Sequence, residues 1–144
     1  MAEALIVLLL VGLLSSMALP AFTAQLNRTS SAQDIHAIQS AIEFARAQAL
    51  LLQNDVLVCP LLNSSTCGNH WQQSVAIMQC TPDSCTLLRE LHLFNKNASL
   101  TASRQSVRFN KQGMAQGNNL RLTYHASPLQ RDFIINNEGR LRIE

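Results

Sequence analysis

The stretch EALIVLLLVGLLSSMALPAFTAQL, residues 3–26, decides the architecture of this chain. It is apolar from Ala4 to Leu19 except for one glycine and two serines, and it carries a single charge, Glu3, at its start. Continued through Pro20, such a run is long enough as a helix to reach the roughly 30 Å of a bilayer's hydrocarbon core. We therefore expect residues 1–28 to form the transmembrane half of an N-terminal helix.

A second, amphipathic segment follows the apolar run. Apolar residues recur there at spacings of three and four, the pattern of one helix face, at Ile35, Ile38, Ile42, Ala45, Ala49 and Leu52. We expect the remaining surface to face water or other subunits, with Gln33, Asp34, Gln39, Ser40, Glu43 and Arg46 on it. The two segments together predict one nearly continuous helix from Glu3 to about Gln53.

After Asn54 the chain changes to short β-type runs separated by turn-forming residues. The runs lie at residues 56–58, 74–78, 87–94, 106–109, 120–124, 133–135 and 141–143. The sequence therefore predicts an α+β fold, in which a long N-terminal helix packs on a small antiparallel β-sheet or β-sandwich. We expect a soluble head at residues 29–144, made of the amphipathic helix, 29–53, and a β-rich domain, 54–144.

Four cysteines fall within a short stretch beyond the apolar run, at Cys59, Cys67, Cys80 and Cys85. An even number in that position favours two disulfides, and proximity favours Cys59–Cys67 and Cys80–Cys85 among the three possible pairings. The spacings lack the paired knuckles of common zinc sites. Zinc binding and free thiols are the alternatives to this pairing.

The charges are distributed unevenly along the chain. The net charge of +2 is too small to indicate a nucleic-acid partner by itself. However, residues 1–87 include two basic and five acidic residues, whereas residues 88–144 include nine basic and four acidic residues. The basic surface is therefore expected in the C-terminal part.

Several segments carry a resemblance to a known family. Glu3 at the mouth of an apolar helix, with Pro20 seventeen residues later, resembles the N-terminal helix of type IV pilins and type II secretion pseudopilins. Three segments of the head, in order, resemble the FimT/GspH family: Val58-Cys59-Pro60 with Cys67 and Trp71, then Phe109 to Gly113, then Ile134 to Arg140. The likeness covers nearly the whole chain.

The resemblance implies a single-pass protein of the bacterial inner membrane, with its head in the periplasm or, after assembly, outside the cell. It implies that Glu3 and Pro20 serve assembly with other pilin subunits, Glu3 pairing with a neighbour's terminal amine, which makes a buried carboxylate tolerable. An interfacial charge at the helix end is the alternative for Glu3. The family's short basic leader is absent from these residues, so we expect a start downstream of the usual one or no leader cleavage. A cleaved secretory signal near Ala21–Ala24 is a further alternative.

The terminal text Gly139-Arg140-Leu141-Arg142 is similar to the DNA-binding motif of the family's FimT minor pilins. In a strand after a glycine turn, the two arginines point to one face about 7 Å apart, close to the spacing of successive phosphates. We expect further contacts from Lys96, Arg104, Arg108 and Lys111. Few aromatic residues are available for base stacking, which favours sequence-independent phosphate contacts.

We therefore expect a minor pilin of a type IV pilus that binds extracellular DNA non-specifically for uptake in natural transformation. The alternative is a structural minor pseudopilin that primes assembly of a pilus or a type II secretion pseudopilus without binding DNA. The four histidines lie outside metal motifs, and no nucleophile arrangement is recognisable. No enzyme activity, cofactor or metal is therefore expected.

Overall fold

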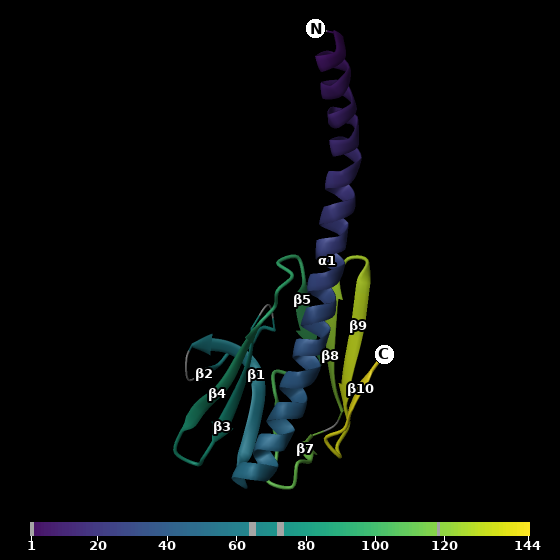
Figure 1. Ribbon diagram of the computed structural model, residues 1–144. Coiled ribbons are helices and arrows are strands. Elements are labelled where there is room, and N and C mark those ends of the chain that lie inside the picture. Colours follow the sequence, from purple (N-terminus) through teal and green to yellow (C-terminus); the bar gives the residue numbers. More distant parts are fainter. Residues whose placement is uncertain (1, 64–65, 72–73, 118) are drawn as a thin grey trace.

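A computed structural model describes residues 2–63, 66–71, 74–117 and 119–144 of the protein. Between residues 2 and 20 it describes side-chain surroundings only at positions 3, 7, 9 and 12. The described chain forms a long helix and two antiparallel sheets, and Figure 1 shows the helix projecting far beyond the sheets at its N-terminal end. The expected α+β architecture is confirmed.

The helix α1 (Ala2–Leu52) has 51 residues and is therefore about 76 Å long. The predicted helix from Glu3 to about Gln53 is confirmed, and Pro20 lies inside it. Gln53 ends the helix in a left-handed conformation, with φ of 52°, and its side-chain amide donates to the carbonyl of Leu50 at 2.8 Å. That bond satisfies one of the carbonyls that a helix end leaves without a partner.

The predicted transmembrane half of the helix, residues 1–28, is helical from Ala2 onward. Within the part of the chain whose side chains are described, no helix is long and apolar enough to cross a membrane. Most of the apolar run at residues 4–19 lies outside that part. Beyond the run, residues 21–29 are exposed, among them Phe22 and Leu26, so this stretch of helix makes little contact with the head.

The first sheet has the strand order β4-β3-β1-β6-β7, with β2 paired to β1. Its strands are β1 (Asp55–Asn63), β2 (Thr66–Cys67), β3 (Ser74–Cys80), β4 (Cys85–His92), β6 (Val107–Phe109) and β7 (Ala115–Gln116). The second sheet has the order β10-β9-β8-β5. Its strands are β5 (Ser99–Ala102), β8 (Leu120–Ala126), β9 (Leu129–Ile135) and β10 (Leu141–Ile143). In Figure 1 the C-terminal half of α1 runs in front of both sheets.

All seven predicted β runs coincide with strands of the structure, and β2, β5 and β7 were not predicted. β2 and β7 have two residues each, which is too short to show the alternation that identifies a strand. The main core lies between the helix and both sheets. It joins Ile38, Ala41, Ile42, Ala45 and Ala49 of α1 to buried residues of the two sheets, including Val56, Val58, Ile77, Phe109, Leu100, Leu122, Phe133 and Ile135.

The predicted apolar stripe of the helix is docked as expected, but it also contains a charged residue. Asp34 was expected on the water-facing side, and it is fully buried instead. The reason is its position four residues before Ile38, which places it on the same face of the helix. Leu52, the last stripe residue, is 36% exposed because the helix ends there.

The buried Asp34 carboxylate joins the helix to both the β4–β5 loop and the second sheet. It accepts hydrogen bonds from the backbone N–H groups of Phe94 at 2.6 Å and Asn95 at 3.1 Å, and from the Tyr124 hydroxyl at 2.8 Å. Asn95 in turn donates to the Ser31 hydroxyl at 2.9 Å. A buried carboxylate with three donors is well compensated for its lost hydration.

A smaller apolar cluster lies on the face of the first sheet that points away from the helix. It contains Cys59, Ala76 and Met78, and both disulfides border it. The disulfides are Cys59–Cys67 and Cys80–Cys85, as the spacing predicted, and no cysteine is left free. The first ties β2 to β1, and the second joins cross-strand partners of the β3–β4 hairpin.

We predict that the titration of Tyr124 reports the Asp34 contact. Burial, followed by the hydrogen bond and the charge of Asp34, raises the pKa of Tyr124 from 10.0 to about 12. The neutral phenol is therefore favoured in the folded state. Its contribution to stability is fully present below pH about 10 and is lost as the pH rises to about 12.

The chain has a single tyrosine, so tyrosinate absorbance measured against pH reads this group alone. The Asp34→Asn variant should titrate at lower pH than the wild type, and Glu43→Gln, which changes an exposed carboxylate, should leave the midpoint unchanged. A wild-type midpoint near pH 10 in the folded protein would contradict the contact.

We also predict that the two disulfides stabilise the head unequally, by about 2–4 kcal/mol in total. The Cys80–Cys85 turn is already closed by a backbone bond from Thr81 to Ser84 at 2.9 Å, so removing this disulfide should cost less. Urea unfolding of the double-alanine variants of each pair measures the difference. Equal losses, or a larger loss for Cys80→Ala/Cys85→Ala, would contradict this order.

Candidate nucleic-acid interface

The turn between β9 and β10 fixes where the candidate arginines begin. Gly139 donates its N–H to the carbonyl of Asn136 at 2.9 Å, and Asn136 donates to the carbonyl of Arg140 at 3.1 Å. The Asn136 side-chain oxygen accepts from the N–H of Arg140 at 2.8 Å. Gly139 has φ of 75°, a conformation that glycine adopts without strain. The turn thus presents Arg140 in one defined orientation of the backbone.

The same turn is packed tightly against the rest of the head. A side chain at Gly139 would collide with the carbonyl of Gly113, which accepts a hydrogen bond from Nε of Arg46 on the helix at 3.1 Å. The N–H of Ala115 also donates to the carbonyl of Asn137 at 3.1 Å. Gly139 is buried, so it positions the arginines and has little surface to offer a ligand.

Arg142 lies on the outer face of β10, an edge strand of the second sheet, and Arg140 immediately precedes this strand on the same side. Their side chains are 75% and 77% exposed. Leu141 between them packs against the main core, as strand alternation requires. The two arginine side chains therefore point outward on the same side of the sheet, in the arrangement that was predicted.

Each of these arginines has a carboxylate close to it. Nε of Arg140 lies 3.4 Å from Glu138, and a terminal nitrogen of Arg142 lies 4.0 Å from Glu144. All four side chains are more than half exposed, so such pairs contribute only about 0–1 kcal/mol each. The charge of the two arginines is locally balanced, which a count along the sequence does not reveal.

Sheet register adds Arg121, which was not predicted as a site residue. Ile134 of β9 is the partner of Arg142 on one side and of Arg121 on the other. Arg121 and Arg142 therefore share a row on the outer face, two strand spacings or about 10 Å apart. Arg121 is 58% exposed and lies 3.4 Å from Asp132. Alternation in β8 indicated its outward direction, but only the strand order places it beside Arg142.

Two other predicted residues lie toward this region. Arg104 directly follows Ser103, whose N–H donates to the carbonyl of Arg121 at 2.9 Å. Lys111 lies in the turn that contains Gly113 and therefore borders the Gly139 turn.

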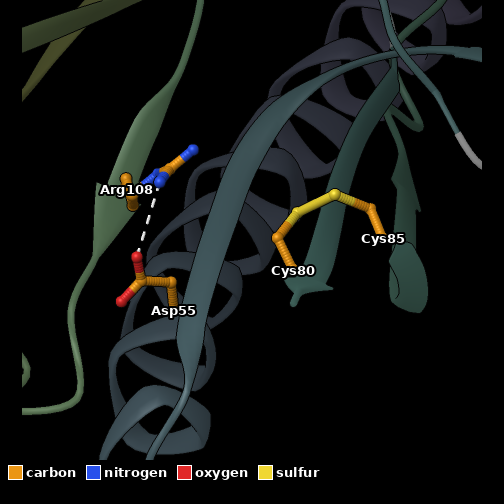
Figure 2. A network of polar contacts seen from close by, with 4 residues as sticks. All are labelled: Asp55, Cys80, Cys85 and Arg108. Carbon is orange, nitrogen blue, oxygen red and sulfur yellow. Dashed lines mark hydrogen bonds and ion pairs between the residues drawn. A yellow bond between two sulfur atoms is a disulfide. The ribbon is translucent and has the colours of Figure 1, made fainter. Parts of the chain in front are cut away.

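The remaining two predicted residues lie elsewhere. Lys96 is in the β4–β5 loop, beside the helix near Asn27. Arg108 extends from β6 on the first sheet and lies 3.5 Å from Asp55 of β1, which separates it from the Cys80–Cys85 disulfide (Figure 2). The structure therefore does not bring Lys96 and Arg108 together with Arg140 and Arg142.

The predicted assembly residues lie outside the head. Glu3 is exposed in the first turn of α1, and Pro20 falls within the same helix. The four histidines are dispersed over the surface, at His36, His70, His92 and His125. Within the described residues, no three side chains of the His, Cys, Asp and Glu types gather where they could hold a metal ion.

Comparison with known proteins gives the family and the fold. The family model of the type II transport protein GspH matches residues 34–139. No curated protein sequence matches this chain. The structure is similar to the type IV minor pilin FimU of Pseudomonas aeruginosa, with 13% identity and a TM-score of 0.62 over 81% of this chain and 91% of FimU.

A second solved structure is also similar. The minor pseudopilin EpsH from the type 2 secretion system of Vibrio cholerae has 13% identity and a TM-score of 0.56, over 76% of this chain and 91% of EpsH. At such identities the likeness shows a shared fold. The family model covers well over half of the chain, including the Asp34 contact and the Gly139 turn. The chain therefore belongs to the GspH family of minor pilins and pseudopilins.

Proposed function

We propose that this minor pilin binds extracellular DNA through phosphate contacts and serves its uptake in natural transformation. The observation that supports the proposal most directly is the pair Arg140 and Arg142, which are held outward and exposed at the start of the edge strand β10. Their backbone is fixed by the Gly139 turn, so little ordering is required when a ligand binds. Contacts of this kind position a nucleic acid without reading its sequence.

The carboxylates beside the arginines are compatible with this function. Guanidinium groups bind phosphate in the same bidentate manner as they bind carboxylate. The contacts to Glu138 and Glu144 are long and exposed, so a phosphate group can replace them at small cost. Arg121 extends the surface inward along the sheet, and Arg104 and Lys111 border it.

The second candidate function is a structural pseudopilin that primes assembly of a pilus or a type II secretion pseudopilus. The local charge balance favours it, because Arg121, Arg140 and Arg142 each have an acidic neighbour within 4.0 Å. A surface without net charge attracts DNA less strongly than bare arginines would. The two functions differ in one measurable property, which is the affinity of the head for DNA.

For either function we propose that the N-terminal half of α1 is the membrane anchor and the assembly element. The apolar run at residues 4–19 supports this role, as does the exposed helix that follows it. Glu3 would pair with the terminal amine of a neighbouring subunit in the fibre. The protein would then cross the bacterial inner membrane once, with its head in the periplasm before assembly.

We predict opposite effects on DNA binding from two variants of the same surface. Arg140→Gln/Arg142→Gln should weaken binding and lower the slope of log affinity against log salt by about 1.8, since each duplex phosphate contact contributes about 0.9. Glu138→Gln/Glu144→Gln should strengthen binding, because it removes the competing carboxylates. Fluorescence anisotropy with a labelled duplex, on the detergent-solubilised full chain at low salt, measures both.

Lys96→Gln/Arg108→Gln is the matched control, because it removes two positive charges away from β10 and should change affinity little. Duplexes of scrambled sequence should bind alike. Unchanged affinity in a folded Arg140→Gln/Arg142→Gln variant would remove these residues from the site. No measurable affinity in the wild type would favour the structural pseudopilin.

For the anchor, we predict that residues 29–144 alone are folded and soluble without detergent, whereas the full chain requires detergent. The fragment retains Ser31, Asp34 and the whole docked stripe of the helix. Size-exclusion chromatography and circular dichroism of the two proteins compare them. A detergent-free monomer of the full chain would contradict the anchor.

A further inference from the structure

A cavity of about 700 Å³ lies where the helix leaves the head. The helix forms one wall, from Ala24 to Ile35, and the β8–β9 turn forms the other, from His125 to Leu129. Figure 1 shows this turn beside α1 at the end of the head from which the long N-terminal part of the helix projects. Ala32, Ile35 and Pro128 give the cavity an apolar floor.

The polar groups around this cavity are suited to an anion. Arg28 from the helix and Arg131 from β9 line it, together with the exposed imidazole of His125. Asn27 and Ser127 add groups that can donate hydrogen bonds. None of the described residues that line the cavity carries a carboxylate. This differs from the outer face of the second sheet, where Arg121, Arg140 and Arg142 each have an acidic neighbour.

The place of the cavity along the helix indicates which anion it meets, given the membrane anchor proposed above. A hydrocarbon core of roughly 30 Å takes about 20 residues of helix. Counted from Ala4, that span ends near Thr23. The headgroup layer extends some 5–8 Å further on each side, so it covers the next four or five residues, Ala24 to Arg28. Three of these residues, Ala24, Asn27 and Arg28, line the cavity.

We propose that this cavity binds the headgroup of an anionic phospholipid, with Arg28 and Arg131 on its phosphate and the apolar floor against its glycerol and upper acyl carbons. The site would orient the head on the membrane before the subunit is extracted into a fibre. The inference rests on the proposed membrane anchor and is independent of DNA binding.

The test uses the full chain in nanodiscs of phosphatidylcholine and phosphatidylglycerol in equal parts. After the protein is released from the nanodisc, native mass spectrometry counts the lipids of each kind that remain bound to it. The wild type should retain phosphatidylglycerol in preference, and the preference should fall about fivefold for each arginine removed in Arg28→Gln/Arg131→Gln. The matched control is Arg89→Gln/Arg108→Gln. Arg89 lies over the ring of Phe44, which is sixteen residues or about 24 Å along the helix from Arg28, and Arg108 lies against Asp55, beyond the C-terminal end of the helix. Both charges are therefore more than a screening length from the cavity.

A second pair of variants separates the cavity from mere surface charge. Ala32→Phe fills the exposed floor and leaves both arginines in place, so it should abolish the preference, whereas Ser40→Phe, at an exposed helix position outside the cavity, should not. Preference retained in Ala32→Phe or in Arg28→Gln/Arg131→Gln would overturn the site. If the mass spectra show dimers of the chain, and if the Arg28→Gln/Arg131→Gln variant abolishes them, the cavity would be assigned to a second copy of the chain instead.

The outcome for the membrane anchor is read separately. A chain that enters nanodiscs but shows no lipid preference overturns the headgroup site and leaves the anchor standing. A chain that does not enter nanodiscs overturns both.

Discussion

The head depends on one buried carboxylate. Asp34 lies on the docked face of the helix and holds two backbone N–H groups of the β4–β5 loop and the hydroxyl of Tyr124 on β8. A carboxylate without these donors would cost several kcal/mol in that apolar surrounding, so the docking of the helix depends on the loop and on the sheet. The contact also fixes the rotation of the helix, because only one face of it carries the charge.

The two ends of the head on either side of this contact carry different surfaces. Toward the N-terminus the helix leaves the sheets, and two arginines line a cavity whose described lining residues include no carboxylate. Toward the other end, Arg46 reaches the Gly113 carbonyl, against which the Gly139 turn is packed. One helix thus positions both surfaces, and it separates them by most of the length of the head.

Much of the fold could be predicted from the sequence, because helix periodicity, turn residues and cysteine spacing are local signals. The helix bounds, the disulfides and the longer strands follow from them. Asp34 was predicted on the wrong face of the helix. A charged residue on a docked face is recognisable only when its partners are known, and these partners lie about sixty and ninety residues away in the sequence. Arg121 and the acidic partners of the arginines were likewise set by strand register, which no local pattern specifies.

The balance of charge on the outer face of the second sheet has a consequence for crowding. If this head is assembled beside other heads in a fibre, as proposed above, like charges on facing surfaces would repel. A surface on which each guanidinium keeps its own carboxylate is close to neutral as seen from a neighbouring subunit. Such heads can pack side by side without strong repulsion. The positive charge of the arginines acts on other molecules only when a ligand displaces the carboxylates.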